Sequence, residues 1–224
     1  MTPLDHPVWA TLAHQPLWAQ GGPLARRFKP DIHPFAAARD DSPESLAALA
    51  ALVGPADDAV FLAQAAPVVV PPGLVLARQA LGVQMLADRL LPLDEGVKEL
   101  GEADAPEMLA LARLTEPGPF RPRTHTLGRF VGIRLDGRLA AMAGQRLRFP
   151  GHVEVSGVCT HPDFRGRGLA RRLSAAVTAY LQARGEQPFL HAWTTNTPAI
   201  ALYESIGFVT RARIHIAVLT RPPA

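Results

Sequence analysis

The stretch HPDFRGRGLARRL, residues 161–173, combines glycine, arginine and the start of an apolar-periodic helix. Gly166 and Gly168 carry no side chain, so a ligand can approach their backbone N–H groups closely. The periodicity predicts a helix over 166–184, and the first turn of a helix presents unsatisfied N–H groups and the positive end of its dipole. Such a point binds phosphate, most simply a diphosphate. Four arginines add positive charge around it: Arg165, Arg167, Arg171 and Arg172.

Two other phosphate-binding loops fit this stretch less well. A Walker A loop needs Lys and Ser or Thr after its last glycine, where this chain has Leu169 and Ala170. The dinucleotide pattern needs a third glycine at the position of Arg171. A phosphate-binding module for another nucleotide is therefore a disfavoured rival, which competition by ATP or NAD would separate from the main interpretation.

A second constellation, NTPAIALYESIGF at residues 196–208, predicts a short helix with one distinctive face. Asn196, Ala199 and Tyr203 lie three and four residues apart and therefore share that face. Gly207 ends the helix in the manner of a C-terminal cap. A tyrosine on a helix is more often a packing residue, so the meaning of Tyr203 depends on the first motif.

The elements around these motifs follow the order β-α-β-β-β-α-β-α-β-β from about residue 97. Asp136-Gly137 is a strong hairpin signal, and Pro150-Gly151 turns the chain into the next strand. The order predicts an α/β fold with a mixed central sheet flanked by helices and one parallel crossover. The predicted strands are 97–101, 130–135, 138–149, 152–160, 189–194 and a final pair within 208–219, and the predicted helices are 103–115, 166–184 and 197–205.

The first 95 residues are irregular, because prolines recur too densely for long helices in most of this stretch. Ser42, followed by Pro43, predicts a short helix that runs to Leu52. Strands are predicted at 59–64 and 73–80, with a third element at 83–87. No polar cluster with catalytic spacing occurs here, so we expect a smaller accessory region for packing or oligomerisation.

Composition narrows the class of protein. With 224 residues, 48% of them hydrophobic and 19% charged, the chain is globular rather than disordered. The net charge is only +3, and the pI near 9.6 reflects the arginine-rich composition of a GC-rich bacterial genome, so nucleic acid is not an expected partner. The single cysteine, the absence of a visible signal peptide and the lack of a long apolar run predict a cytoplasmic location without membrane contact. The histidines lack metal-ligand spacing, so no metal is predicted.

Together the two motifs resemble the GNAT superfamily of acetyl-CoA-dependent N-acyltransferases, and in particular its FR47-like branch. GVCTHPDFRGRGLARRL is similar to the family's diphosphate motif R-G-x-G-x-G/A, with Ala170 at the last position. NTPAIALYESIGF matches the family's N-x-x-A-x-x-L-Y-x-x-x-G-F motif at every fixed position. The resemblance covers about residues 97–220 and predicts a GNAT domain at 96–224. Residues 1–95 fall outside it, as a degenerate half-copy of the same fold or a family-specific cap.

The resemblance implies where acetyl-CoA, the expected co-substrate, would bind. The pantetheine arm would bond to the strand before the turn like an added strand, and Gly157 suits the bulge that splays this strand from its parallel neighbour. Asn196 would bond the pantetheine amides, and Cys159 would contribute mainly its backbone. The residues expected to bind the pantetheine arm along the strand are Val158, Cys159 and Thr160. The residues expected to bind the diphosphate are Arg165, Gly166, Arg167, Gly168, Leu169 and Ala170.

The same resemblance implies an N-acetyltransferase in which an amine attacks the thioester directly in a ternary complex. Tyr203 matches the family's general acid, since a phenol of pKa about 10 can protonate the leaving thiolate. A protonated amine of pKa about 10.4 must first lose a proton, and Glu154 is the predicted base, with His152 as its rival and water alone as the third option. The alternative function is a non-catalytic acyl-CoA-binding sensor or scaffold. The acceptor amine stays open among small amines, amino acids, antibiotics and protein N-termini, and a homodimer is compatible with the sequence although no residue specifies one.

Overall fold

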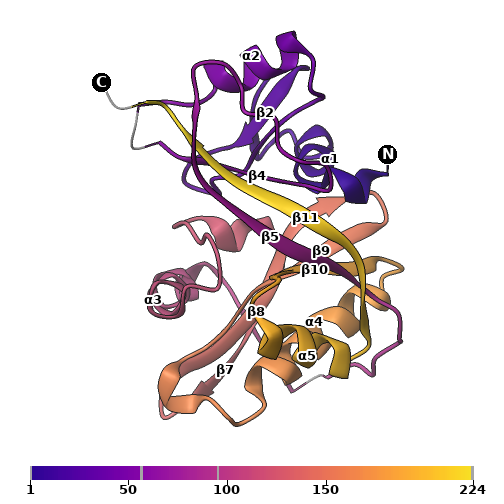
Figure 1. Cartoon of the computed structure of the whole chain (residues 1–224). Helices are drawn as coiled ribbons and strands as arrows, with labels where there is room; N and C mark the ends of the chain where they lie inside the picture. Colours follow the sequence, from indigo (N-terminus) through magenta and orange to yellow (C-terminus); the bar gives the residue numbers. More distant parts are fainter. Residues whose placement is uncertain (1, 56–57, 95, 223–224) are drawn as a thin grey trace. The chain divides into compact units, whose positions relative to one another are not determined.

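The computed structural model describes residues 2–55, 58–94 and 96–222, and the chain divides into two compact units (Figure 1). The first unit contains Met1–Pro30, Pro34–Val83 and Ala212–Ala224, and the second contains Asp31–His33 and Gln84–Arg211. The division predicted between residues 95 and 96 falls inside the second unit. Across the described residues, no helix is both long enough and apolar enough to cross a membrane.

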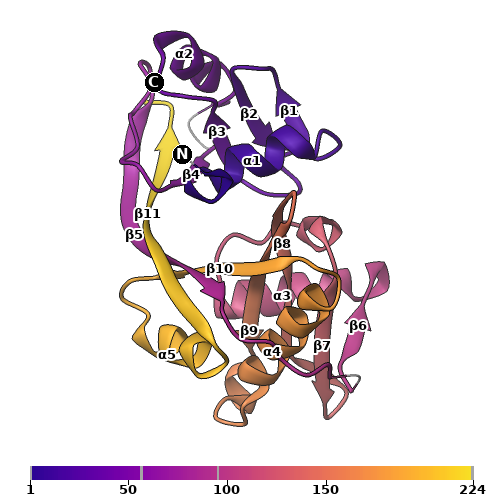
Figure 2. The ribbon, with the colours of Figure 1, turned by 90° about the vertical axis from the view of Figure 1, so that its right-hand side faces the viewer.

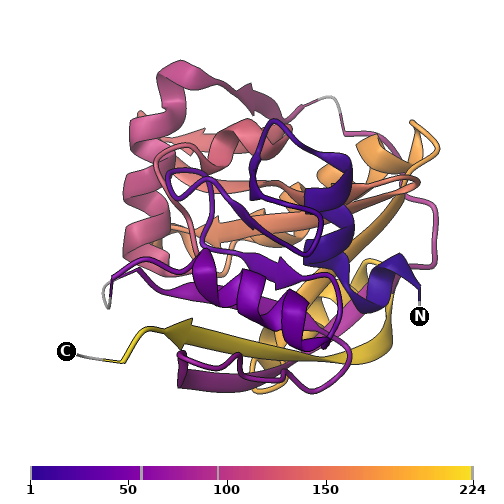
Figure 3. The same cartoon turned by 90° about the horizontal axis from the view of Figure 1, so that it is seen from above.

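The first unit is a small α/β assembly in which α1 and α2 both contact β2 and β3 (Figure 3). Its helix α2 starts as predicted, because the Ser42 hydroxyl oxygen accepts a hydrogen bond from the Ser45 N–H at 3.3 Å. Strands β1, β2 and β3 form an antiparallel sheet, while β4 pairs antiparallel with residues 215–219 of β11. The elements are η1 (Pro3–Asp5), α1 (Pro7–His14), β1 (Ala19–Gly21), β2 (Ala25–Phe28), β3 (Ala36–Ala38), α2 (Pro43–Ala51) and β4 (Val60–Gln64).

The second unit is the predicted mixed sheet, with the strand order β5-β10-β9-β8-β7-β6. Strands β9 and β10 are parallel and joined by α4, whereas β9, β8, β7 and β6 pair antiparallel in turn. Helices α3 and α4 lie on opposite faces of β8 and β9 (Figure 2). The strands are β5 (Val75–Ala87), β6 (Lys98–Leu100), β7 (Phe130–Leu135), β8 (Arg138–Phe149), β9 (His152–Thr160), β10 (Gln187–Trp193) and β11 (Phe208–Thr220). The helices are η2 (Glu102–Asp104), α3 (Ala105–Thr115), η3 (Thr124–Leu127), η4 (Pro162–Phe164), α4 (Leu169–Gln182) and α5 (Thr197–Ser205).

Most predicted elements are confirmed, and the differences have local causes. Residues 73–80 and 83–87 belong to one strand, β5, rather than two, and the predicted final pair is the single strand β11. Both long strands run through both units, which explains their length. Helix α1 and strands β1–β3 were not expected. Pro7 occupies the first position of α1, where a proline starts a helix instead of breaking one.

Two bulges interrupt the ladder between β8 and β9. Between the pairs Met142↔Cys159 and Gly144↔Ser156, two β9 residues face one β8 residue, and Gly157 adopts a φ of 63° there. This confirms the bulge predicted at Gly157, because a left-handed backbone favours glycine. The parallel ladder between β9 and β10 ends at the pair Phe189↔Glu154. Beyond that pair, strand β9 continues toward the glycine turn without a β10 partner.

Close packing fixes the bulged segment of β9 against the core. The Phe130 ring is 2% exposed and lies so near Gly144 that a Cβ atom on this glycine would come within 2.3 Å of it. The same ring would meet a Cβ on Gly157 at 3.0 Å. These contacts belong to a buried apolar cluster beneath α3 that also contains Met108, Met142 and Cys159. The backbone of β9 is therefore held in place from one face.

Candidate acetyl-CoA cleft

One cleft in the second unit, with a volume of about 720 Å³, runs from β9 over the glycine turn to α5. It brings together every residue that the sequence assigned to acetyl-CoA binding, and Tyr203 as well. The remaining wall comes from the end of α3 and the residues after it, Thr115–Pro117. The cleft residues that the sequence predicted are Val158, Cys159, Thr160, Arg165, Gly166, Arg167, Gly168, Leu169, Ala170, Asn196 and Tyr203.

The glycine turn has the geometry of an anion cradle. Gly166 and Gly168 have φ values of 75° and 73°, and a Cβ atom on either would meet no atom within 4 Å. Gly168 is the N-cap of α4, whose first intrahelical bond runs from the Arg172 N–H to the Gly168 carbonyl at 3.0 Å. The N–H groups of residues 169–171 therefore precede the hydrogen-bond ladder and face the open space above the glycines. This arrangement fits a diphosphate.

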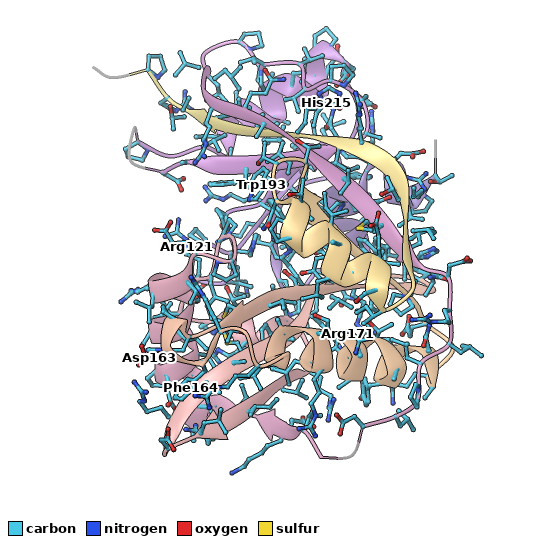
Figure 4. The ribbon with its side chains drawn as sticks, turned by 60° about the horizontal axis from the view of Figure 1, so that its bottom comes forward. Arg121, Asp163, Phe164, Arg171, Trp193 and His215 are labelled. Atoms are coloured by element: carbon cyan, nitrogen blue, oxygen red, sulfur yellow. The ribbon has the colours of Figure 1, made fainter. Side chains whose placement is uncertain are left out.

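The arginines of the turn have different partners. Arg167 stacks on the Phe164 ring, 5.3 Å from its centroid, and Arg171 donates from Nε to the Ser205 hydroxyl of α5 at 3.2 Å. Figure 4 labels Phe164 and Arg171. Arg172 instead donates from Nε to Asp94 at 2.6 Å and does not line the cleft. The expectation that Arg172 adds charge to the diphosphate site is therefore wrong, since Asp94 compensates its guanidinium. Arg165, Arg167 and Arg171 supply the positive charge of the cleft.

Residues 158–160 of β9 form one wall of the cleft, and the hydroxyl of Thr160 in this wall has no hydrogen-bond partner among the described residues. The Cys159 thiol points into the core, where the residue is 6% exposed, and burial raises its pKa to about 11. A thiol of that pKa stays protonated and unreactive at neutral pH, in agreement with a structural role. The Oγ1 atom of Thr160 is buried without a hydrogen-bond partner among the described residues. A buried polar atom of this kind, in the wall of a cleft, suits a ligand that brings polar atoms.

Helix α5 forms the opposite wall of the cleft. The Asn196 side-chain oxygen caps this helix by accepting a hydrogen bond from the Ala199 N–H at 3.3 Å. The Tyr203 ring packs edge-on against Phe208, with 6.0 Å between centroids, and is half-buried. Burial, together with the negative charge of Glu154, raises the pKa of Tyr203 to about 12. Its hydroxyl therefore holds a proton throughout the neutral and mildly alkaline range.

Glu154 lies outside the cleft, at the end of the parallel ladder, and is fully buried. Its carboxylate accepts four hydrogen bonds. Arg146 donates from Nε at 2.8 Å and from Nη2 at 2.5 Å, the Leu147 N–H donates at 3.3 Å, and the His191 ring bonds through Nδ1 at 2.7 Å. Burial alone would raise the pKa of Glu154, but the charge and hydrogen bonds of Arg146 outweigh it and hold this pKa well below the usual range.

This environment does not suit the role of general base that the sequence assigned to Glu154. A carboxylate saturated by an ion pair has little affinity for a further proton. The rival, His152, is placed no better, because it lies six positions before Val158 along the strand, a distance of roughly 20 Å. Its Nδ1 atom also lies 3.2 Å from the Pro150 carbonyl oxygen at the start of β9.

The structure adds a buried polar network that the sequence did not indicate. Gln84 contacts the Nε2 atom of His191 through its amide nitrogen at 3.1 Å, and Arg211 donates to the amide oxygen of Gln84 at 2.8 Å. The network therefore connects Arg146, Glu154, His191, Gln84 and Arg211 across the sheet. The sequence indicates this network only by placing Glu154 and His191 in two strands that are predicted to be parallel.

Three basic side chains of the loop at 116–129 have acidic hydrogen-bond partners. Arg123 pairs with Asp31 at 3.1 Å, His125 with Glu102 at 2.8 Å and Arg129 with Glu99 at 2.9 Å. The Thr124 hydroxyl donates to the Ile32 carbonyl at 2.6 Å, which ties the loop to the 31–33 segment of the same unit. Within the described part of the chain, no group of three or more potential metal ligands is found.

Comparisons with known proteins agree with this geometry. The family model of FR47-like proteins matches residues 130–216. A crystal structure of a candidate acetyltransferase of the GNAT family from Novosphingobium aromaticivorans is 46% identical, with a TM-score of 0.93 and coverage of 100% of both chains.

Two curated relatives match shorter stretches. The N-alpha-acetyltransferase RimI of Mycobacterium tuberculosis is 39% identical over 82 residues, which is 35% of this chain and 51% of that protein. The mycothiol acetyltransferase of Thermobispora bispora is 48% identical over 59 residues, 26% of this chain and 19% of that protein. The matches thus span about half or less of these curated relatives. The FR47-like model matches only part of the chain, whereas the GNAT structure from N. aromaticivorans matches along its whole length, so the chain belongs to the GNAT family.

Proposed function

We propose that this chain is an acetyl-CoA-dependent N-acetyltransferase that passes the acetyl group directly to an amine in a ternary complex. The observation that carries the proposal is the single cleft that joins the glycine turn, residues 158–160 of β9 and Tyr203 of α5. A diphosphate-binding turn, an exposed strand backbone and a proton donor are the three parts that this transfer needs. They come from separate elements and meet in one cavity.

The residues divide the binding of acetyl-CoA between them. The N–H groups at 169–171 and the arginines of the turn would hold the diphosphate, while Val158, Cys159 and Thr160 would pair with the pantetheine amides through their backbone. Asn196, at the start of α5, would bond the same arm from the other side. Acetyl-CoA supplies an acyl group activated as a thioester.

Transfer then requires two proton movements. The neutral amine nitrogen attacks the thioester carbonyl carbon, a C–N bond forms, the C–S bond breaks, and the leaving thiolate takes the proton of the Tyr203 hydroxyl. Tyr203 is supplied with a new proton from solvent. Because Glu154 is saturated and His152 is remote, we assign the proton lost by the amine to solvent water. About one amine in a thousand of pKa 10.4 is neutral near pH 7.4, which is enough to start the reaction.

The alternative, a non-catalytic acyl-CoA sensor or scaffold, would use the same cleft without a proton donor. The position of Tyr203 favours the enzyme, because the residue lines the same cleft as the glycine turn and residues 158–160, where a sensor needs no proton donor. A Tyr203→Phe variant separates the two functions. If the protein is an enzyme, the variant still binds acetyl-CoA but no longer transfers the acetyl group. If the protein is a sensor, the variant behaves like the wild type.

The proposal is tested first by calorimetric titration with acetyl-CoA, CoA and ATP. The perturbing variant is Gly168→Asp, which puts a carboxylate on the turn that would hold the diphosphate. Two negative charges about 5 Å apart repel each other by about 1.7 kcal/mol at an effective dielectric constant of about 40, which corresponds to more than tenfold in Kd. Any side chain also strains the left-handed backbone at this position.

Gly185→Asp is the matched control. Gly185 has the same φ of 73° and equally open surroundings, but it follows α4 and does not line the cleft. We expect wild type and Gly185→Asp to bind acetyl-CoA in the micromolar range and ATP much more weakly, and Gly168→Asp to bind neither. If the wild type ignores acetyl-CoA, the glycine turn is only a basic helix start and the proposed function is wrong.

A further inference from the structure

The buried network around Glu154 lies where β9 and β10 separate. The last backbone pair between these parallel strands is Phe189↔Glu154, although β9 runs on to Thr160 and β10 to Trp193. His191 is two residues beyond that pair on β10. Its bond to Glu154, 2.7 Å from Nδ1 to Oε1, is therefore a side-chain bridge that continues the connection between the strands where the backbone ladder stops.

The proton positions in this bridge follow from its neighbours. Arg211 donates to the amide oxygen of Gln84, so the amide nitrogen of Gln84 faces His191 and donates to its Nε2 atom. An Nε2 atom that accepts a hydrogen bond leaves the ring proton on Nδ1. His191 consequently donates to the Glu154 carboxylate, and the bridge is a charge-assisted hydrogen bond.

A bulge on β8 completes the anchoring of Glu154. Between the pairs Gln145↔Val155 and Arg148↔Val153, two β8 residues, Arg146 and Leu147, face Glu154 alone. The bulge turns the Arg146 guanidinium onto the carboxylate and directs the Leu147 N–H to the same group. Glu154 thus fixes β10 to β8 as well as to its own strand, in a site where its side chain is 0% exposed and that of His191 is 7% exposed.

The position of α5 depends on the end of β10. Only residues 194–196 separate β10 from α5, so Asn196, which caps the helix, and Tyr203, which lies in it, are positioned by the end of β10. The opposite wall of the cleft, residues 158–160, belongs to β9. The bridge between Glu154 and His191 spans these two strands at the point from which the walls diverge.

We propose that Glu154 and His191 are positioning residues whose hydrogen bond sets the width of the acetyl-CoA cleft on its pantetheine side. The inference rests on the proposed function, because it assumes that the pantetheine arm lies between β9 and α5. The diphosphate turn at the start of α4 does not depend on the bridge. Loss of the bridge therefore weakens binding of the pantetheine arm and leaves binding of the nucleotide end unchanged.

The test compares two ligands on three proteins by calorimetry. The ligands are acetyl-CoA and 3′,5′-ADP, which carries the adenosine, the 3′-phosphate and the first 5′-phosphate of coenzyme A but lacks the second 5′-phosphate and the pantetheine arm. His191→Phe removes the donor and retains the ring that packs edge-on against Phe189, 5.7 Å between centroids. His191→Asn is the matched control, because an amide nitrogen replaces Nδ1 as donor to Glu154. We expect the Kd for acetyl-CoA to rise at least tenfold in His191→Phe and less than threefold in His191→Asn, with the Kd for 3′,5′-ADP within twofold throughout.

Each other outcome has a definite meaning. If His191→Phe binds acetyl-CoA as tightly as wild type, or if His191→Asn loses as much affinity, the positioning role is wrong. If His191→Phe also loses 3′,5′-ADP, as an unfolded chain would, Glu154→Gln takes its place and must weaken acetyl-CoA binding alone. A wild type that binds 3′,5′-ADP and acetyl-CoA equally well has no bound pantetheine arm, which refutes the inference but leaves the diphosphate site. A wild type that binds neither refutes the proposed function itself.

Discussion

Tyr203 offers a direct test of the environment of the cleft, because its pKa is raised to about 12. At pH 11 a phenol of that pKa is about one-tenth ionised, whereas one with the reference value near 10 is about nine-tenths ionised. The chain has only two tyrosines, so the absorbance of tyrosinate near 295 nm resolves them. Tyr203→Phe should remove a late component of the titration and leave the remainder in place.

The same shift makes a prediction about stability with a definite sign. The folded state favours the protonated phenol, so its contribution is complete below the unfolded pKa of about 10 and is lost as pH rises through the folded pKa of about 12. Two pKa units correspond to about 2.7 kcal/mol in all, of which about 1.3 kcal/mol is lost between pH 9 and pH 11. Urea unfolding at these two pH values should show a loss about 1.3 kcal/mol larger for wild type than for Tyr203→Phe.

The control for both measurements is the Phe variant, which retains the packing of the ring against Phe208 and lacks only the hydroxyl. Glu154→Gln should move the late component to lower pH, because the charge of Glu154 contributes to the shift. The reasoning is refuted if Tyr203→Phe removes a component that titrates near pH 10. Equal losses of stability in the two proteins would refute it as well.

Two further predictions concern packing around the cleft. The pKa of the buried Cys159 thiol is raised to about 11. A thiol reagent at pH 8 should therefore label the folded chain at least a hundredfold more slowly than the chain in urea. Equal labelling rates would place the thiol at the surface. Gly144→Ala should lower the free energy of unfolding by about 1–3 kcal/mol, because its Cβ would come within 2.3 Å of the Phe130 ring. Gly101→Ala is the control, because a Cβ there meets nothing within 4 Å and the free energy of unfolding should change little. Similar losses for the two variants in urea unfolding would contradict the packing argument.

The second unit could be predicted closely because its sequence marks its own boundaries. Asp136-Gly137 and Pro150-Gly151 lie immediately before β8 and β9, and both strands have the predicted bounds, as does α5 before Gly207. Helix α4 starts at Leu169 rather than Gly166, because the two glycines adopt left-handed conformations before it. Expectations about location, dimerisation and the accessory role of residues 1–95 stay predictions.

The first unit was harder to predict for a physical reason. Dense prolines predict few helices there, and α2 starts at Pro43 as predicted, but Pro7 is the first residue of the unexpected helix α1, where a missing N–H costs nothing. Strands β1 and β3 have only three residues each, too short for a hydrophobic alternation to be recognised. They pair with β2 across short connections, and local patterns do not encode the packing of β2 and β3 against α1 and α2.

The acetyl-CoA cleft and the polar network around Glu154 differ in how clearly the sequence indicates them. The cleft binds its ligand mainly through backbone groups, so the sequence indicates it by Gly166, Gly168 and the helix that follows them. The polar network depends on the side chain of Glu154, and a bulge in β8 places Arg146 and Leu147 opposite this residue. Strict alternation predicts that Glu154 faces a cleft as a free base. The extra residue in β8 instead gives it the guanidinium of Arg146, and a carboxylate held in this way can orient strands but cannot readily take a proton.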